Sequence, residues 1–366
     1  MLSEADYLFH NPDIDFLPRK AREAILYDLF KSQVEYVRRE VMFYATKYAK
    51  LDISRIKNYH DFGKVLPPLF KEEIRTLNSP YDLIGNDQKK NMGQIHFHRG
   101  TGGTTGEPTS MFFTNNDWTA VLGAMTRSLI ELKMLDKQII AFNGYNQGHI
   151  SGPIFDDTIR LIGGFSIARH FVSDDITAVK SMKKHNCNVI IAPAQSTHKG
   201  GSIQDLLDAD ATSGTNYING DNIDAILCSS TNLSRELYDE LTSLGIKIIY
   251  NYYGSTDALP TAISCQHSPL DLHILEGHIS LFVVNEEYVH AKNNERGLVF
   301  ASRIGGYDDN GALSLQKGTQ MLNFITGDEV TFIDEPCKCG RTTPRIRDIK
   351  RVKYQKEKIE GGCEVW

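Results

Sequence analysis

The stretch from His96 to Ser110, HFHRGTGGTTGEPTS, gathers residue types suited to binding an anion. Its residues 100–106 are four glycines and three threonines: Gly100, Gly102, Gly103, Gly106, Thr101, Thr104 and Thr105. The glycines free the backbone to turn so that its N–H groups converge, and the threonines add hydroxyl donors. Because a concave set of such donors binds phosphate well, the stretch predicts a phosphate-binding loop.

Two common nucleotide motifs do not describe this loop. A Walker A loop ends in Gly-Lys-Ser/Thr, whereas here Gly106 is followed by Glu107 and Pro108. The dinucleotide fingerprint requires a glycine where Thr105 stands. An ordinary flexible turn therefore stays open beside a phosphate site of another kind.

Two later segments place an acid next to a strand-like run. In IKIIYNYYGSTDALP, a strand is followed by Tyr252, Tyr253, Gly254, Ser255, Thr256 and Asp257. In FITGDEV, the pattern predicts a turn at Thr326, Gly327 and Asp328 after another strand. Either acid alone is typical of a capped turn, but the two occur here together and in this order.

The elements around these motifs follow from hydrophobic periodicity. Residues 19–50 repeat apolar side chains at a helical period and predict an amphipathic helix. From about residue 76, strand-like runs alternate with helix-length segments, which indicates βαβ units and a largely parallel sheet. Beyond residue 271 the runs alternate and are broken by turns, which predicts an antiparallel, barrel-like subdomain.

Composition bounds the function classes. The chain has 366 residues, of which 41% are hydrophobic, enough for a large core. Its 40 basic and 46 acidic residues are mixed and give a net charge of −6, so we expect no nucleic-acid partner. The start of the chain does not resemble a signal peptide, and no run approaches 18 apolar residues. We therefore expect a cytoplasmic protein without a membrane partner.

In this order the motifs resemble the adenylate-forming (AMP-binding) superfamily, and most of all its phenylacetate-CoA ligase branch. The resemblance spans about residues 10–350 and includes LPPLFKEEIR, from Leu66 to Arg75, similar to the branch's Leu-Pro-x-x-x-Lys stretch. It implies an α/β fold, the N-terminal domain of these enzymes, with mixed sheets flanked by helices plus a smaller antiparallel barrel-like subdomain. The implied domains are a helical segment (1–75), a nucleotide- and acyl-binding core (76–264), the barrel-like subdomain with a zinc site (265–350) and a hinge remnant (351–366).

The resemblance also implies the activity. Members join a carboxylic acid to ATP with Mg²⁺, forming an acyl-AMP and pyrophosphate, and pass the acyl group to a thiol or an amine. The phosphate loop would hold the β- and γ-phosphates through Thr101, Gly102, Gly103, Thr104, Thr105 and Gly106. Thr256 would contact the α-phosphate, Asp257 would hold Mg²⁺, and Asp328 would accept from the ribose hydroxyls. The adenine would lie beside the turn residues Tyr252, Tyr253, Gly254 and Ser255 and the wall Leu227–Asn232, which includes Ser229 and Ser230.

The acyl pocket and the metal site follow from the same resemblance. The family's acyl-pocket lining falls on FNGYNQGHISG and makes Phe142, Asn143, Gly144, Tyr145 and His149 the substrate contacts. The cysteine and histidine positions of the branch fall on Cys265, His273, Cys337 and Cys339. Three thiolates and one imidazole form a closed tetrahedral set that suits structural Zn²⁺. His267 is a competing ligand, and reduced cysteines without metal are the alternative.

Several positions depart from the family pattern. The loop usually ends Gly-Lys-Pro, and the acid of the turn is usually Glu, whereas here Glu107 and Asp257 stand. Members continue into a C-terminal lid with a catalytic lysine, which this chain is expected to lack, leaving Lys350, Arg351 and Lys353 as partial substitutes.

The expected partners follow from these features: a small carboxylic acid, aromatic or amino acid; CoA, a carrier protein or an amine as acceptor; a protein supplying the lid; and a second copy in a homodimer. Two alternatives stay open. One is a nucleotide- or acyl-adenylate-binding protein that has lost turnover and acts through a partner. The other is an amide-forming ligase.

Overall fold

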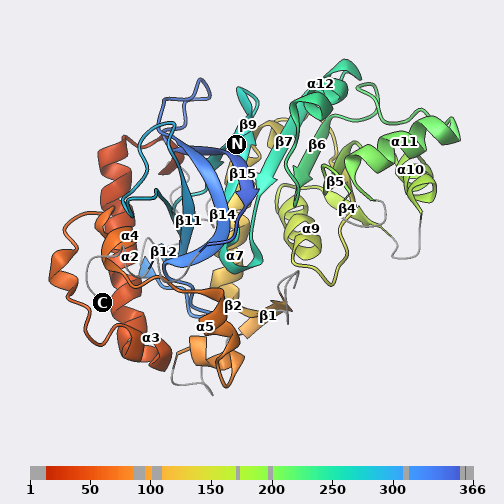
Figure 1. Ribbon diagram of the computed structural model, residues 1–366. Coiled ribbons are helices and arrows are strands. Elements are labelled where there is room, and N and C mark those ends of the chain that lie inside the picture. Colours follow the sequence, from red (N-terminus) through yellow and green to blue (C-terminus); the bar gives the residue numbers. More distant parts are fainter. Residues whose placement is uncertain are drawn as a thin grey trace. The chain divides into compact units, whose positions relative to one another are not determined.

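The computed structural model describes residues 14–85, 95–100, 109–169, 174–196, 201–307, 313–354 and 359. By its internal contacts the chain divides into two compact units. The first comprises residues 1–124, 255–261 and 273–366, and the second comprises residues 125–254 and 262–272. Each unit is described by itself below, with the element labels of Figure 1.

The first unit begins with short and long helices. They are η1 (Ile14–Phe16), α2 (Arg19–Glu40), α3 (Met42–Lys47), η2 (Ile53–Arg55), α4 (Asp61–Val65), α5 (Lys71–Arg75) and η3 (Pro80–Leu83). The amphipathic helix predicted over residues 19–50 is thus interrupted, because Val41 takes an extended conformation with φ −122° between α2 and α3. The rings of Phe30 on α2 and Phe62 on α4 stack at 4.2 Å.

The strands of the first unit are antiparallel. They are β1 (Ile95–Gly100), β2 (Ser110–Thr114), β10 (Ile279–Val284), β11 (Arg296–Arg303), β12 (Gly306–Tyr307), β13 (Leu313–Ser314), β14 (Phe324–Ile333) and β15 (Arg345–Arg351). The order β10-β11-β14-β15 forms one antiparallel sheet, and β1 with β2 and β12 with β13 form separate pairs. The antiparallel character predicted beyond residue 271 is confirmed.

The second unit alternates strands and helices. Its elements are α8 (Ile130–Lys133), β3 (Ile140–Asn143), α9 (Ser151–Leu161), β4 (Phe165–Ala168), α10 (Asp175–Lys184), β5 (Val189–Pro193), α11 (Ile203–Ser213), β6 (Ala225–Ser229), α12 (Arg235–Ser243), β7 (Ile248–Tyr253) and β8 (Ala262–Cys265). Strands β3 to β7 are parallel, and β8 pairs antiparallel with β7, so the predicted parallel sheet is confirmed.

The sheet of the second unit is covered on both faces, as Figure 1 shows. Apolar side chains from α10, α11 and α12 form a buried cluster with one face of the strands, including Ile190, Ile226 and Ile249. On the other face, Phe155 of α9 contacts the ring of Tyr252 on β7 at 5.7 Å. Parallel strands buried on both faces read as near-continuous apolar runs, which is why VIIAP and AILCS are so hydrophobic.

Two elements extend across the boundaries in sequence: α7 (Asn115–Ser128) and β9 (Ser268–Ile274). Among the described helices, none is long and apolar enough to cross a membrane.

Candidate active site and metal centre

The turn after β7 holds the first of the two acids. Ser255 caps the short helix η4 (Thr256–Ala258), because its hydroxyl accepts from the Asp257 amide at 3.3 Å. The same hydroxyl donates to Asp257 Oδ2 at 3.1 Å. Thr256 and Asp257 are both buried. A Cβ at Gly254 would lie 2.3 Å from the Tyr252 hydroxyl, so only glycine fits before this turn.

Two cationic side chains, Lys71 and Arg351, act electrostatically on the carboxyl group of Asp257. Burial raises the pKa of Asp257 above its usual range, while Lys71 of α5, the Ser255 hydroxyl and Arg351 of β15 each act to lower it. Oδ1 of Asp257 is buried and has no hydrogen-bond partner among the residues that the structure describes. An unpaired carboxylate oxygen of this kind suits a hard cation, whose charge would hold the carboxylate ionised.

The second acid lies within a strand. Sequence analysis predicted a turn at Thr326, Gly327 and Asp328, but all three belong to β14. The turn-like pattern marks an irregularity instead: Gly327 has φ +79°, and the pairing of β14 with both β11 and β15 shifts register near it. The amide of Asp328 donates to the Thr326 hydroxyl at 3.1 Å across this irregularity.

Arg351 fixes the carboxylate of Asp328. The register of β14 and β15 places Asp328 directly opposite Arg351. The Nη1 group of Arg351 donates to Asp328 Oδ1 at 2.9 Å and to the Thr326 carbonyl at 2.7 Å. Asp328 is 8% exposed, so this charge-assisted bond holds a largely buried acid in one orientation.

Sequence reasoning gave Lys71 no role and offered Arg351 only as a substitute for a lid lysine. Lys71 stands in the LPPLFKEEIR stretch, whose resemblance to the family was the available signal. The contact of Arg351 with Asp328 depends on the irregular register of β14, which no spacing in the sequence reveals.

In the second unit, the carboxyl ends of parallel strands bring the adenine-side candidates to one edge. Strands β6 and β7 pair with Cys228 opposite Asn251, so Ser229 and Tyr252 follow at the same level. Ser229 is buried, and Ser230 has a left-handed backbone with φ +65° that ends β6 sharply. Ligands of parallel α/β sheets bind outside this edge.

The acyl-pocket candidates lie at the end of β3 and in the segment after it, at the same edge. Phe142 packs in the buried cluster, and the amide of Gly144 donates to the Ile191 carbonyl at 2.8 Å. The Asn143 side chain is fully buried, donates to Gly152 and Asp156, and accepts from the Tyr145 amide at 3.0 Å. Asn143 therefore shapes the segment that presents Tyr145 and His149.

Tyr145 and His149 are the polar side chains of this segment. The Tyr145 ring is 7% exposed and lies 5.5 Å from the ring of Phe155. Burial raises the pKa of its hydroxyl, and the hydroxyls of Ser230 and Ser229 act in the opposite direction. Nδ1 of His149 accepts from the Ser151 amide at 3.2 Å, and burial lowers the pKa of the imidazole.

The phosphate loop cannot be placed beside these residues. Thr101, Gly102, Gly103, Thr104, Thr105 and Gly106 lie outside the described residues.

The cysteine and histidine candidates come together. Single ligand atoms of Cys265, His273, Cys337 and Cys339 all lie within 4.8 Å of one another. Cys265 ends β8 and His273 lies on β9, so one hairpin carries both, whereas His267 is exposed in its turn. The other two ligands flank a tight turn in which the Gly340 amide donates to the Cys337 carbonyl at 3.0 Å.

The environment of His273 fits a metal ligand. Its Nδ1 lies 3.0 Å from the Thr343 hydroxyl and 3.2 Å from the Thr343 carbonyl. Since a carbonyl only accepts, Nδ1 carries the proton and Nε2 is left as a ligand atom. Nε2 lies 3.4 Å from the sulfur of Cys339. Three sulfurs and one oriented imidazole match the donor set of a structural zinc site.

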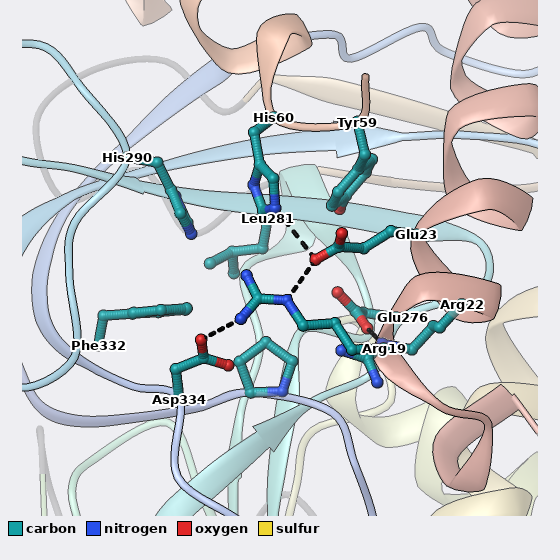
Figure 2. A pocket seen from close by; sticks show the side chains of 11 residues that line it. Arg19, Arg22, Glu23, Tyr59, His60, Glu276, Leu281, His290, Phe332 and Asp334 are labelled. Carbon is teal, nitrogen blue, oxygen red and sulfur yellow. Dashed lines mark hydrogen bonds and ion pairs between the residues drawn. The ribbon is translucent and has the colours of Figure 1, made fainter.

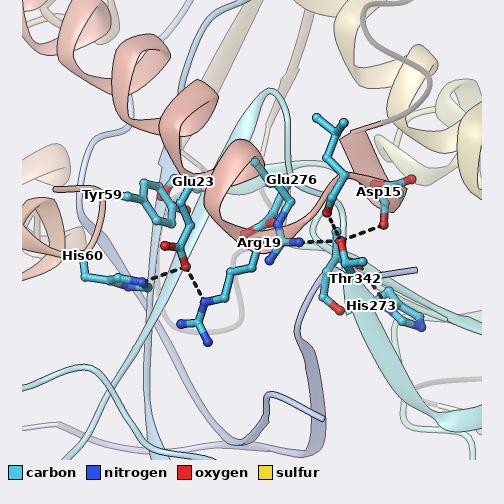
Figure 3. Close-up of polar contacts among 12 residues, drawn as sticks. Asp15, Arg19, Glu23, Tyr59, His60, His273, Glu276 and Thr342 are labelled. Carbon is cyan, nitrogen blue, oxygen red and sulfur yellow. Dashed lines mark hydrogen bonds and ion pairs between the residues drawn. The ribbon is translucent and has the colours of Figure 1, made fainter. Parts of the chain in front are cut away.

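Thr342, two residues after the 337–340 turn, is hydrogen-bonded to the start of the described chain, as Figure 3 shows. The amide of Thr342 donates to the Asp15 carbonyl at 2.7 Å, and its hydroxyl donates to the Leu17 carbonyl at 2.5 Å. Arg22 of α2 donates to the same hydroxyl at 2.6 Å. Arg22 also forms a buried ion pair with Glu276, with Nε and Oε2 2.6 Å apart.

A small polar cavity of about 20 Å³, room for one water molecule, lies beside this ion pair (Figure 2). It is lined by charged and imidazole side chains with a few apolar ones: Arg19, Arg22, Glu23, Tyr59, His60, Glu276, Leu281, His290, Phe332, Asp334 and Pro344. Arg19 joins Glu23 and Asp334 by ion pairs. The rings of His60 and His290 lie 5.0 Å apart.

The chain is similar in sequence to one CoA ligase and in fold to structures of another. No family model matches the chain. The chain is 23% identical over 360 residues to a phenylacetate-coenzyme A ligase of Thermus thermophilus, covering 93% of this chain and 73% of that protein.

Solved structures share the fold. One structure of 2-hydroxyisobutyryl-CoA ligase, in complex with its acyl-AMP and CoA, aligns with a TM-score of 0.77 at 15% identity. That alignment covers 93% of this chain and 70% of the ligase. A postadenylation-state structure of the same ligase aligns with a TM-score of 0.79 at 14% identity, covering 96% of this chain and 72% of that one.

Proposed function

We propose that this chain is an adenylate-forming enzyme that activates a carboxylic acid with ATP, which its sequence relative and its shared fold support. The products of this step are an acyl-adenylate and pyrophosphate. The acyl group then passes to a thiol, on CoA or a carrier protein, or to an amine. The similar ligases, which act with CoA by their names, support a thiol as the acceptor.

The observation that carries this proposal is the pair of acids in the first unit. Asp257 and Asp328 are both largely buried, and Arg351 bonds to Asp328 and acts electrostatically on Asp257. In the proposed complex Asp328 accepts from the ribose hydroxyls while Arg351 holds its carboxylate in place. Thr256, next to the metal-binding acid, donates to the α-phosphate.

Mg²⁺ is the proposed partner of Asp257. The unpaired buried Oδ1 supplies a hard oxygen ligand, and Lys71 and Arg351 balance the charge of the carboxylate. When bound, the ion neutralises charge on the phosphates during attack by the substrate carboxylate. The loop residues Thr101, Thr104 and Thr105 are proposed to hold the β- and γ-phosphates.

The adenine and the acid are assigned to the second unit. Ser229, Ser230, Tyr252 and Tyr253 are proposed to flank the adenine at the carboxyl edge of the sheet. Tyr145 and His149 are proposed to contact the acid. Since a buried phenol and a neutral imidazole each offer hydrogen bonds, the substrate is proposed to be an aromatic acid with a polar substituent or an amino acid.

The cysteine cluster is proposed to hold structural Zn²⁺. Cys265, His273, Cys337 and Cys339 supply a closed set of four ligands, which leaves no position for a reacting water. The metal would link the β8–β9 hairpin to the turn before β15.

The test is ATP–pyrophosphate exchange by the purified chain with Mg²⁺ across aryl, hydroxyaryl, fatty and amino acids. We expect exchange that depends on one class of acid, and hydroxylated aromatic or amino acids should exceed unsubstituted ones. If none of the acids supports exchange while ATP still binds, the result would instead favour a binding protein that acts through a partner. Hydroxylamine would trap the acyl-adenylate as a hydroxamate, and AMP release stimulated by CoA or by an amine, each added separately, would then distinguish thiol from amine acceptors.

A matched pair of variants assigns the exchange to this site. Asp328→Asn removes the charge that holds the ribose and should reduce exchange about a hundredfold, mainly through the KM for ATP. Glu329→Gln changes the neighbouring acid, which pairs with Arg296, and should leave exchange within about twofold. Equal rates for both variants would exclude Asp328 from the nucleotide site.

A further inference from the structure

A buried polar network in the first unit holds strand β2. The segment of residues 316–320 forms neither helix nor strand, yet four of its five residues are buried. Buried irregular backbone is stable only where its polar groups find partners. Here the partners are the side chains of Gln33 on α2, Tyr44 on α3, Asp117 on α7 and Arg303 on β11.

Asp117 provides the largest share of these bonds. It is 1% exposed and accepts three backbone amides: Thr114 at 2.8 Å, Lys317 at 3.1 Å and Gly318 at 2.7 Å. Asp117 is also the third residue of α7, and its own amide donates to the Thr114 hydroxyl at 3.2 Å, as in a capping box. One carboxylate thus joins the end of β2, the start of α7 and the 316–320 segment.

Thr319 bonds directly to β2. Its hydroxyl accepts from the Phe112 amide at 2.9 Å, and its own amide donates to the Phe112 carbonyl at 2.9 Å. A Cβ at the adjacent Gly318 would lie 2.1 Å from that carbonyl, so the backbones approach as closely as glycine permits. The 316–320 segment therefore sets where Phe112 can lie.

Arg303 secures the segment from β11. Its fully buried guanidinium lies 4.4 Å from the ring of Phe113 and donates to the Thr319 carbonyl at 3.1 Å and to Gln316 at 2.8 Å. Burial lowers the pKa of Arg303, and the Asp117 carboxylate acts to raise it. From α2, Gln33 donates to the Gln316 carbonyl and to the Gln320 side chain.

Holding a strand with this network carries a free-energy cost of desolvation. The buried charges of Arg303 and Asp117 cost desolvation that apolar packing does not, so their use indicates that position matters more than stability. Strand β2 begins at Ser110, opposite Gly100 at the end of β1, and residues 101–109 connect the two. Phe112, the residue bonded to Thr319, stands two positions from the start of β2.

We propose that Asp117 and Thr319 are positioning residues for ATP, which set the base of the predicted phosphate loop through β2 without touching the nucleotide. The inference rests on the proposed function. It adds that affinity for ATP depends on a hydrogen-bond network in the interior of the unit.

Two substitutions of Thr319 separate position from stability. Thr319→Val keeps the volume and removes the acceptor of the Phe112 amide, whereas Thr319→Ser keeps the acceptor and removes a methyl group. We expect Thr319→Val to raise the Kd for Mg-ATP about tenfold and Thr319→Ser to leave it within about twofold. Tm is measured for both, and the change in Kd should follow the hydroxyl and not Tm.

Asp117→Asn is the second probe and should raise the Kd at least as far, since an amide nitrogen would face the backbone donors. If it fails to fold, the Thr319 pair still decides. Equal Kd values for Thr319→Val and wild type overturn the inference and leave the proposed function intact. A wild type that binds no ATP overturns the proposed function and the inference with it.

Discussion

At the scale of single residues, the candidate site depends on acids whose charge is balanced from within the same unit. Asp328 is hydrogen-bonded directly to Arg351, whereas Lys71 and Arg351 act on the buried Asp257 electrostatically. The two acids should therefore respond differently to substitution. Asp328 is already oriented, while burial opposes the ionised form of Asp257, which a bound cation would favour.

Substitutions of Asp257 test its role as a metal ligand. Asp257→Asn keeps the shape but removes the charge, so we expect pyrophosphate exchange to fall about a hundredfold or more and the Mg²⁺ requirement to rise. Asp257→Glu restores a carboxylate and should retain most of the exchange. The measurement is exchange rate against Mg²⁺ concentration for the three proteins.

Asp257→Asn should lower the exchange rate without lowering Tm. Because burial raises the pKa of Asp257, the ionised acid opposes folding near neutral pH, and neutral asparagine should maintain or increase Tm without Mg²⁺. A variant that lost exchange together with Tm would point to a structural role instead.

At the scale of elements, the β8–β9 hairpin and the 337–340 turn share the candidate metal site. Each contributes two of the four candidate ligands. The hairpin offers two histidines, and the geometry selects one. His273 is buried with its Nδ1 on Thr343, whereas His267 is exposed in the turn.

The two histidines provide a matched metal test. His273→Ala should lower the bound zinc from about one ion per chain to near zero, and His267→Ala should leave it unchanged. Metal content and the absorption spectrum of the Co²⁺-substituted protein are the readouts. Metal retained by His273→Ala but lost by His267→Ala would reverse the ligand assignment.

At the scale of the whole molecule, the buried Glu276 and the partly buried His290 beside the cavity of Figure 2 act on stability in opposite directions. Burial raises the pKa of Glu276 to about 7, against the effect of Arg22. Burial, with His60 and Arg19 nearby, lowers the pKa of His290 to about 4. Between about pH 4.5 and 6.5 the folded chain holds a proton on Glu276 that the unfolded chain releases. Over the same window it lacks a proton on His290 that the unfolded chain binds.

These opposite terms predict a hidden pH dependence of the free energy of unfolding. With rising pH, the contribution of Glu276 to the free energy of unfolding falls and that of His290 rises, so in wild type the two largely cancel. Glu276→Gln leaves the His290 term, and stability should increase by about 3 kcal/mol from pH 4 to 6.5 relative to wild type. His290→Phe should give a decrease of similar size from about pH 4.5 to 7. Denaturant unfolding at several pH values measures both, and parallel curves for all three proteins would contradict the prediction.

Hydrophobic periodicity was enough to predict the parallel strands, because runs such as VIIAP and AILCS are buried on both faces. It was not enough for residues 19–50, since nothing in the apolar period reveals the extended Val41. The four metal-ligand candidates meet as the resemblance implied. The pairing of Arg351 with Asp328 and the bonds from Asp117 to Lys317 and Gly318 were not predictable, because they depend on register and on an irregular segment 200 residues away.

Because Asp328 lies inside strand β14, it is more vulnerable to a change in chain length than to most exchanges of side chains around it. Side chains alternate between the two faces of a strand, so one residue gained or lost in this part of β14 would turn the carboxylate to the opposite face. It would also move Arg351 away from its partner on the neighbouring strand. Descendants of this gene can vary the side chains of β14, but a single inserted or deleted codon there would remove the acid from its site.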